Sequence, residues 1–263
     1  MKNVSIALLG CGTVGKGVID LLQMNGQLIS EQLNTAITIK HVLVRDVPKY
    51  EAADLPASIN LTDDFRDIVE DDAVEIIVEV MGSADFAKEC IEEAFRRGKS
   101  VVSANKDVIA DYGIPLLKLA HEHGADFQFE ASVAGGIPIV RPMYSSLNSN
   151  KIEEIIGIMN GTTNFILSSM TDRGLSYEDA LREAQEKGYA EADPANDVGG
   201  FDAARKIAIL AKLGFHAYVT FNDVSVEGIQ HITKDDIAHA TAMGYVIKLL
   251  AVARQEDDGI SLA

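Results

Sequence analysis

The stretch VSIALLGCGTVG (residues 4–15) decides the fold of this chain. Its first half is an unbroken apolar run of strand length, which is typical of a buried strand. Gly10, Gly12 and Gly15 then follow at Gly-x-Gly-x-x-Gly spacing, and helical sequence comes next. Such glycines allow a tight turn, a close approach to a pyrophosphate and close helix–strand packing. The stretch therefore predicts a dinucleotide at the amino end of the helix, and a merely tight turn is the alternative.

Strand-like and helical segments continue to alternate after this unit. The alternation predicts an α/β fold with a doubly wound, Rossmann-type parallel sheet, and we assign residues 1–131 to it as a dinucleotide-binding domain. We expect its later strands at residues 37–44, 74–80, 100–104 and 126–131. We expect its helices from the glycine turn to Leu33, from a cap at Thr62, from Met81 to Gly98 and over 115–124.

The end of the second strand bears on the choice of cofactor. An acid there suits the ribose 2′-hydroxyl of NAD, whereas an arginine suits the 2′-phosphate of NADP. Arg45 favours NADP, with Lys49 close by, and Asp46 leaves NAD open. Lys106 follows the strand at 100–104, and ligands bind at the carboxyl ends of such strands. We expect Lys106 to face cofactor or substrate, and the alternative is a solvated loop lysine.

Residues 132–263 lose the regular alternation and predict a mixed α+β domain for substrate binding and dimerisation. A glycine turn at 130–140 precedes a helix, the polar turn NGTTN (160–164) opens another, and a third runs from Ser176 to Gly188. Apolar runs predict strands at 151–159, 224–229 and 245–253.

The segment GYAEADPANDVGGFDAARK (188–206) carries the residues best suited to chemistry. Asp202 and Lys206 are four residues apart, so they share one face of the helix that begins there. That helix is apolar nearly all round, with Arg205 and Lys212 marking its solvent side, so Lys206 points toward protein or a pocket. An ammonium held by a carboxylate in such a place can exchange a proton in a fixed direction, and a surface ion pair is the alternative.

Composition excludes several other classes of function. The net charge of −17 argues against nucleic acid and anionic membranes as partners. No apolar run reaches the roughly 18 residues of a membrane span, and no signal peptide is apparent, so we expect a cytoplasmic protein. Cys11 and Cys90 make no disulfide framework, and the histidines lack metal-ligand spacing.

Five segments together resemble the homoserine dehydrogenases, from residue 4 to the end of the chain. They are GCGTVG (10–15), SANKDV (103–108), EASVAGGIPI (130–139), MNGTTNFIL (159–167) and the long segment 188–206. The resemblance implies reversible reduction of L-aspartate 4-semialdehyde to L-homoserine with NADPH or NADH, in threonine and methionine biosynthesis. The resemblance implies that family members continue past Ala263, with a segment that completes the nucleotide domain and often a regulatory domain, and we expect neither within residues 1–263.

The resemblance also implies roles for individual residues. Lys206 would donate a proton to the aldehyde oxygen, Lys106 would help to polarise it, and Asp202 would orient both substrate and Lys206. The substrate contacts would be Glu191, for the amino group, with Asp202, Gly161 and Thr162. The cofactor contacts would be Gly10, Gly12, Thr13, Val14, Gly15, Arg45, Lys106 and Gly188. A sodium or potassium ion would be held by Glu130, Val133, Gly135 and Ile137, and the second domain would form a homodimer.

Two other functions remain open from the sequence. One is a related reductase that acts on another semialdehyde. The other is a nucleotide-sensing or scaffold module that keeps the fold without turnover. Lys106, Glu191, Asp202 and Lys206 argue against the sensor, because a sensor needs no proton donor.

Overall fold

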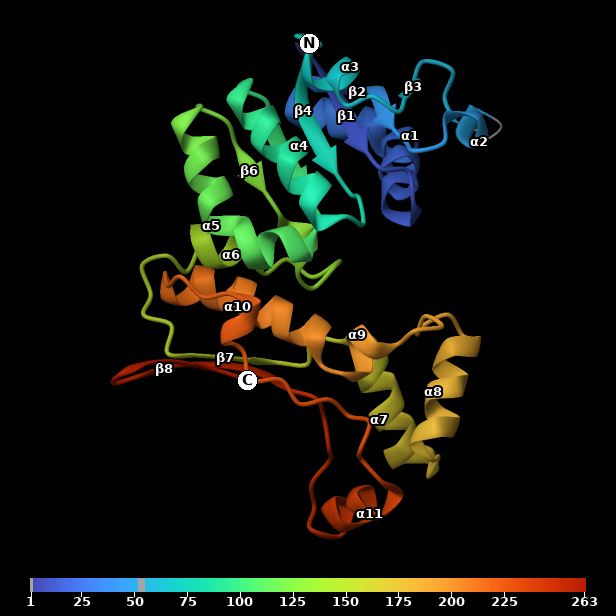
Figure 1. Cartoon of the computed structure of the whole chain (residues 1–263), viewed down its shortest axis with the longest axis vertical. Coiled ribbons are helices and arrows are strands. Elements are labelled where there is room, and N and C mark those ends of the chain that lie inside the picture. The colour runs from blue at the N-terminus through green and yellow to red at the C-terminus, as the bar shows by residue number, and fades with distance from the viewer. Residues whose placement is uncertain (1, 52–54) are drawn as a thin grey trace. The chain divides into compact units, whose positions relative to one another are not determined.

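The computed structural model describes residues 2–51 and 55–263, which fall into two compact units, Met1–Gly136 and Ile137–Ala263 (Figure 1). The boundary between the two units follows Gly136. The sequence predicts a boundary after residue 131. In the described part of the chain, no helix combines the length and the apolar character needed to cross a bilayer.

The first unit is built on a six-stranded sheet whose neighbouring strands are all parallel. The strand order is β3-β2-β1-β4-β5-β6, which confirms the doubly wound arrangement. The chain winds outward in opposite directions from β1, so a crevice opens at the carboxyl ends of β1 and β4. The strands are β1 (Lys2–Leu9), β2 (Thr35–Leu43), β3 (Asn60–Thr62), β4 (Val74–Glu79), β5 (Ser100–Ser103) and β6 (Phe127–Gln128).

Helices of the first unit cover this sheet because their apolar faces need burial. The central strand contributes Leu8 and Leu9, and the helices contribute Ile91, Phe95 and Leu116, all with no more than 1% of their surface exposed. The helices are α1 (Thr13–Leu33), α2 (Val47–Glu51), α3 (Arg66–Val69), α4 (Ala84–Arg96) and α5 (Lys106–Glu122), and a 3₁₀ turn η1 spans Glu130–Ser132.

Three predicted elements of the first unit differ from the structure. The strand expected over 126–131 is shorter, Phe127–Gln128, because the chain enters the 3₁₀ turn η1 at Glu130. Thr62 does not cap a helix, because it ends β3, where its carbonyl accepts the amide of Val44 at 2.9 Å. Its hydroxyl bonds Asp67 instead, and α3 begins only at Arg66. The helix predicted over 115–124 starts earlier, at Lys106, because Asn105 caps it and Pro115 is tolerated inside it.

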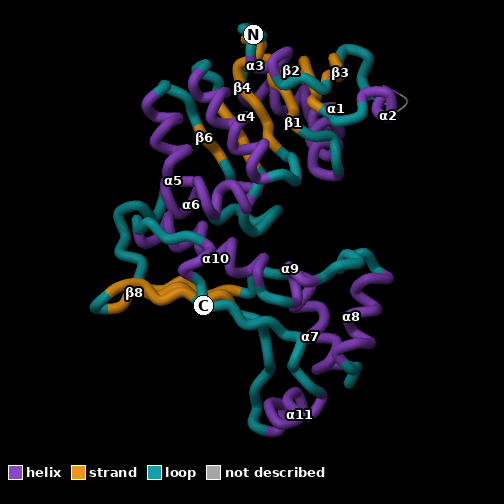
Figure 2. The backbone as a smooth tube through the Cα atoms, viewed as in Figure 1, coloured by secondary structure: helices purple, strands orange, loops and turns teal. Residues whose placement is uncertain are grey.

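The second unit combines an antiparallel sheet of order β7-β8-β9 with several helices (Figure 2). Helices α7, α8 and α11 share one apolar cluster, to which Ile166, Leu167 and Met170 contribute. The helices are α6 (Val140–Ser145), α7 (Gly161–Arg173), α8 (Tyr177–Glu186), α9 (Ala195–Val198), α10 (Phe201–Phe215) and α11 (Lys234–Ala242). The strands are β7 (Glu154–Gly157), β8 (Ala251–Glu256) and β9 (Gly259–Leu262), and a 3₁₀ turn η2 spans Phe221–Asp223.

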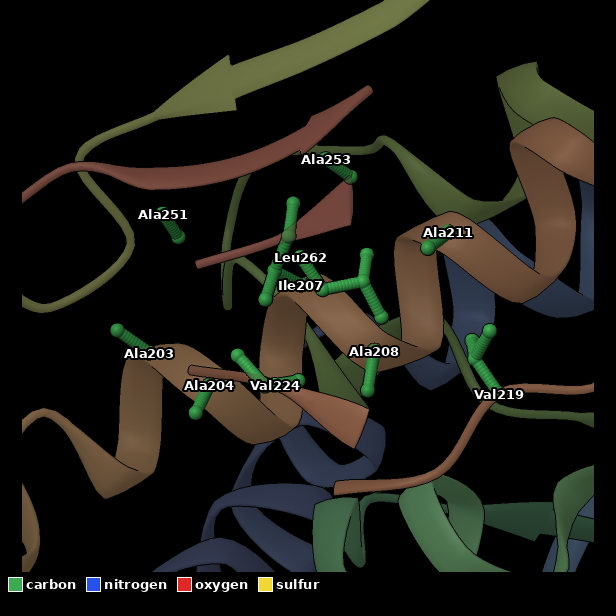
Figure 3. Close-up of a cluster of buried hydrophobic side chains, with 10 residues drawn as sticks. All are labelled: Ala203, Ala204, Ile207, Ala208, Ala211, Val219, Val224, Ala251, Ala253 and Leu262. Carbon is green, nitrogen blue, oxygen red and sulfur yellow. The ribbon is translucent and has the colours of Figure 1, made fainter. Parts of the chain in front are cut away.

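Helix α10 lies against this sheet and fixes where Asp202 and Lys206 stand. Its small and apolar side chains, among them Ala204, Ile207 and Ala208, gather with Ala253 and Leu262 of the strands (Figure 3). Ile207 and Ala208 have no exposed surface. A helix packed this tightly cannot rotate without opening cavities, so it is a rigid support for the side chains on its other faces.

Three predictions for the second unit are wrong. Residues 224–229 form no strand, and only the amide of Ser225 reaches β9, at 3.0 Å from the carbonyl of Leu262. The strand predicted over 245–253 begins at Ala251, where pairing with β7 begins. Lys212 does not mark the solvent side of α10, because it is buried. The pKa of Asp223 is lowered mainly by hydrogen bonds from Thr220, and the positive charge of Lys212 lowers it further.

Candidate active site

The first unit holds a cavity of about 930 Å³ at the carboxyl ends of β1, β2 and β4. Ligands of doubly wound sheets bind at this place, because the crevice between diverging connections lies there. Cys11 also lines the cavity, and burial raises the pKa of its thiol, so it is not poised as a thiolate nucleophile. The lining includes Gly10, Gly12, Leu43, Arg45, Asp46, Lys49, Val80, Met81 and Ser83.

The glycine turn fits a dinucleotide, for a separate reason at each glycine. Gly10 has φ +103°, and a Cβ there would stand 3.0 Å from the carbonyl oxygen of Val80. A Cβ on Gly15 would meet the carbonyl oxygen of Gly10 at 2.3 Å. Nothing lies within 4 Å of a Cβ on Gly12, so that glycine leaves open space beside the start of α1. Thr13 and Val14 open that helix and are exposed.

The lining of the cavity includes the charged residues that the sequence links to the choice between NAD and NADP. Arg45, Asp46 and Lys49 all line it. The backbone amide of Lys49 donates to Asp46 Oδ1 at 3.2 Å, so this carboxylate is partly satisfied by its own turn. This part of the lining thus carries two cationic side chains and one acid whose carboxylate accepts a backbone amide of its own turn.

A buried acid next to the cavity-lining residue Val80 is not predicted from the sequence. Glu79 ends β4 and has no exposed surface. Its carboxylate accepts the hydroxyl of Ser103 at 2.6 Å, the amide of Met81 at 2.7 Å and the side chain of Asn105 at 3.5 Å. Burial raises the pKa of Glu79, and these three hydrogen bonds act in the opposite direction. Glu79 therefore ties the loop after β4 to the loop after β5.

That second loop positions Lys106. The side chain of Asn105 accepts the amide of Val108 at 3.3 Å and caps α5, and its nitrogen donates to the carbonyl of Met81 at 3.3 Å. Lys106 is the first residue of the helix and is half-buried. It stands at the carboxyl end of β5, as the sequence predicts.

The second unit brings Asp202 and Lys206 together. Lys206 Nζ lies 2.6 Å from Asp202 Oδ2 and 2.9 Å from the carbonyl oxygen of Met159. Asp202 is 3% exposed, so this ion pair is not a surface pair. An ammonium carries three N–H donors. Among the described residues no acceptor engages the third, which leaves one proton of Lys206 to be presented to a ligand.

Asn160 completes this cluster, and its role was missed in the sequence. Its side-chain nitrogen donates to Asp197 Oδ1 at 2.7 Å and to Asp202 Oδ2 at 2.9 Å. Its oxygen accepts the amide of Thr163 at 2.8 Å and so caps α7. The signal available was the first Asn of NGTTN, whose residue type is typical of a helix cap, but its acidic partners are distant in sequence.

The other predicted site residues of the second unit differ in their burial and in their contacts. Thr162 is buried, and its hydroxyl donates to the carbonyl of Tyr189 at 2.6 Å, while Gly161 is exposed. Gly188 follows α8 with φ +73°. Glu191 lies exposed on the loop before α9, where its backbone carbonyl accepts the side chain of Gln185 at 3.1 Å. No bond between the Glu191 carboxylate and the cluster is present among the described residues.

The segment predicted to bind a monovalent ion follows β6. Glu130 opens η1 and is half-buried, Val133 is buried, and Ile137 is exposed. The backbone reverses at Ala134, with φ +52°. No group of three His, Cys, Asp or Glu side chains in the described ranges could hold a metal. A site made of one carboxylate and three carbonyls, including that of Gly135, belongs to a different class and suits a hard cation.

Two family models match almost all of this sequence. The one described as "Homoserine dehydrogenase, NAD binding domain" matches residues 10–130. The one described as "Homoserine dehydrogenase" matches residues 138–262. The first match contains the glycine turn and its cavity, and the second contains the cluster of Asn160, Asp202 and Lys206.

Individual proteins are similar along the whole chain. The homoserine dehydrogenase of Bacillus subtilis (strain 168) is 46% identical over 263 residues, which are 100% of this chain and 60% of that protein. The crystal structure of a homoserine dehydrogenase from Thiobacillus denitrificans is 42% identical with a TM-score of 0.93, over 99% of this chain and 60% of that one. A hyperthermophilic archaeal homoserine dehydrogenase in complex with NADPH is 26% identical with a TM-score of 0.80, over 99% of this chain and 81% of that one. The chain thus spans less than two thirds of the length of the first two.

Proposed function

The chain belongs to the homoserine dehydrogenase family, and on that premise we propose that it interconverts L-homoserine and L-aspartate 4-semialdehyde by hydride transfer with NAD(P)(H). The reaction serves threonine and methionine biosynthesis. The observation that carries the proposal is the ammonium of Lys206, held by Asp202 at 2.6 Å and by the Met159 carbonyl at 2.9 Å.

Lys206 acts as proton donor in the direction of aldehyde reduction. The bound nicotinamide supplies or accepts the hydride, and the protein needs only to hold the carbonyl and to neutralise the oxygen as negative charge develops. Lys206 Nζ does both, because it is cationic and has an N–H that no protein acceptor engages in the described part of the chain. In alcohol oxidation the same nitrogen takes the proton back.

Other residues bind and orient the substrate. Asp202 fixes the direction of Lys206, Glu191 receives the substrate amino group, and Gly161 with Thr162 forms part of the pocket. The buried hydroxyl of Thr162 and the exposed carboxylate of Glu191 are compatible with these tasks. Lys106 assists by polarising the carbonyl oxygen, and its place at the carboxyl end of β5 supports that assignment.

The cofactor is NADP in preference to NAD. Support comes from Arg45 and Lys49 in the cavity lining, and from the NADPH complex of the archaeal relative. Gly10, Gly12 and Gly15 with Thr13 and Val14 would hold the pyrophosphate at the start of α1, and Gly188 would add a contact. We assign nucleotide binding to residues 1–131 and substrate binding to 132–263.

We further propose a bound sodium or potassium ion and a homodimer. The ion would be held by the Glu130 carboxylate and the carbonyls of Val133, Gly135 and Ile137. The homodimer would form through the second unit, where Ile156 and Ile158, on and just after β7, are 48% and 47% exposed. Exposed apolar side chains on a sheet are typical of an interface.

The test is the effect of Lys206→Ala on two separate quantities. We expect kcat with L-homoserine and NADP to fall by about 10²- to 10⁴-fold, the usual worth of a positioned acid–base group. The dissociation constant for NADPH, measured by the fluorescence of the nucleotide, should stay unchanged. Lys151→Ala is the control, because this exposed lysine pairs with the exposed Glu153, at 3.3 Å.

Two results would count against the proposal. If Lys206→Ala weakens NADPH binding as much as it slows turnover, Lys206 is not specifically catalytic. If the unaltered protein binds NADPH but oxidises no L-homoserine with either nucleotide, a sensor or a reductase for another semialdehyde becomes the better assignment.

A further inference from the structure

We propose that Asn160 is a positioning residue of this active site, whose amide holds Asp197 and Asp202 side by side so that Asp202 can fix the proton of Lys206. The inference rests on the proposed function for its catalytic consequence. Asn160 is 5% exposed and joins the start of α7 to the residues of α9 and α10 that bear the acids.

The orientation of the Asn160 amide follows from its partners. The amide of Thr163 can only donate, so the oxygen of Asn160 must face it, at 2.8 Å. The nitrogen then faces Asp197 Oδ1 at 2.7 Å and Asp202 Oδ2 at 2.9 Å. Its two hydrogens are thereby used on two carboxylates, and each bond is charge-assisted when the acid is ionised.

The neutrality of this amide matters as much as its geometry. Asp197 and Asp202 bring two negative charges to one nitrogen, and Lys206 brings one positive charge to Asp202 Oδ2, at 2.6 Å. A lysine or arginine in place of Asn160 would compete with Lys206 for Asp202. An amide separates the acids without taking part in proton exchange, so Lys206 remains the group that exchanges a proton.

Charged side chains approach Asn160 from α9 and α10. Asp197 faces it from α9, and Asp202 faces it from α10, with Lys206 bonded to the same oxygen of Asp202 as Asn160. Arg205, the neighbouring cation on α10, donates to the side-chain oxygen of Asn196 at 3.5 Å. From α7 itself the side chain meets Thr163, which is uncharged. A change of charge at residue 160 therefore acts first on the two acids and then on Lys206.

Asn160→Asp is the informative variant. It keeps an oxygen to cap α7, because Asp caps helices as well as Asn does. It replaces the amide nitrogen by an acceptor, so both bonds to the acids are lost and a third carboxylate is added. We expect lower thermal stability, because three carboxylates then stand close together in a buried place. We also expect a kcat at least tenfold lower and an unchanged NADPH dissociation constant. Activity relative to the unaltered protein should rise as pH falls, because a protonated Asp at residue 160 can again donate.

Ser176→Ala is the matched control. Ser176 caps α8 in the same unit, accepting the amide of Asp179 at 3.1 Å. Within the described ranges its hydroxyl bonds Asp179 and no member of the Asn160 cluster. It should lower stability by about 1 kcal/mol, as lost caps do, and leave kcat unchanged. An equal loss of kcat in Ser176→Ala would reduce Asn160 to a cap and overturn the proposal.

A second readout does not depend on turnover. Labelling of Lys206 by an amine-reactive acetylating reagent, followed by mass spectrometry across pH, reports when its amine loses the proton. In Asn160→Asp we expect that labelling curve to move to higher pH by about one unit, since added negative charge retains a proton on a nearby ammonium. An unmoved labelling curve would overturn the positioning role of Asn160, even if the protein had no activity on L-homoserine. A moved curve in a protein without turnover would refute only the proposed reaction.

Discussion

Glu79 is an acid that the fold buries completely at the end of β4. Its hydrogen bonds to Ser103 and to the amide of Met81 stabilise the anion, but desolvation outweighs them, so the pKa of Glu79 is raised. A carboxyl whose pKa is raised on folding contributes stability below its unfolded pKa, and that stability is lost as pH rises through the folded pKa.

Glu79→Gln should remove this pH dependence. Above pH 4.5, the ordinary value for this group, we expect the free energy of unfolding of the unaltered protein to fall relative to that of the variant. The slope in that window is at most about 1.4 kcal/mol per pH unit for one proton. Urea denaturation followed by circular dichroism between pH 4 and pH 8 measures it, and a constant difference across that range would refute the raised pKa.

Side-chain contacts between residues close in the sequence were predictable, and contacts between residues far apart in the sequence were not. Asp202 and Lys206 are four residues apart on one helix, so the helical period alone pairs them. Asn160 meets Asp202 across 42 positions, and Glu79 meets Ser103 across 24. No local rule links such positions. The buried Lys212 was mistaken for a solvent marker because a lysine stem can bury its methylenes, which residue type alone does not reveal.

At the scale of elements, the glycines of the turn between β1 and α1 have two different roles, in packing and in ligand binding. Gly15 serves packing, because a side chain there would collide with the backbone at 2.3 Å. Gly12 serves the ligand, because the space around it is open and its φ of −78° is accessible to any residue.

Alanine substitutions should resolve the two tasks. Gly15→Ala should lower the free energy of unfolding by about 1–3 kcal/mol, the cost of forcing atoms into a packed site. Gly12→Ala should change it by less than about 0.5 kcal/mol, as surface substitutions do, yet weaken NADPH binding about tenfold or more, which is about 1.4 kcal/mol. The chain has no Trp, so nucleotide fluorescence gives a clean binding signal. Equal binding by Gly12→Ala and the unaltered protein would place the pyrophosphate elsewhere.

Helices and strands with a strong local sequence pattern were predicted. Those whose bounds depend on pairing or packing with other segments were not. The central strands and α4 follow from apolar runs, glycines and caps in the sequence. The start of α5 was missed because Pro115 imitates a helix start, whereas the cap at Asn105 holds the true one. Residues 245–250 are apolar enough for a strand, but β7 offers partners only to Ala251 and its successors.

At the scale of the whole molecule, the net charge of −17 opposes compaction. Raising ionic strength shortens the Debye length from about 30 Å at 0.01 M to about 8 Å at 0.15 M, which weakens that repulsion. We expect choline chloride over this range to raise the midpoint of thermal unfolding, because choline screens charge without fitting a small oxygen-lined site.

Sodium or potassium chloride should raise the midpoint further at equal ionic strength if the proposed ion site binds, since a ligand of the folded state stabilises it. Glu130→Gln should remove the additional rise and keep the rise common to all salts. Coincident curves for choline and both alkali chlorides would refute the ion site and leave the charge effect standing.

The sequence by itself determined the parallel sheet, the nucleotide turn and the pairing of Asp202 with Lys206, because each rests on a period or a spacing within a short segment. Only the tertiary structure decided which polar groups share a buried cluster. Asn160 joins Asp197 and Asp202, and Glu79 joins Met81, Ser103 and Asn105, across loops and elements. The physical reason is that buried polar groups must find partners wherever packing places them, and packing is settled by the whole chain.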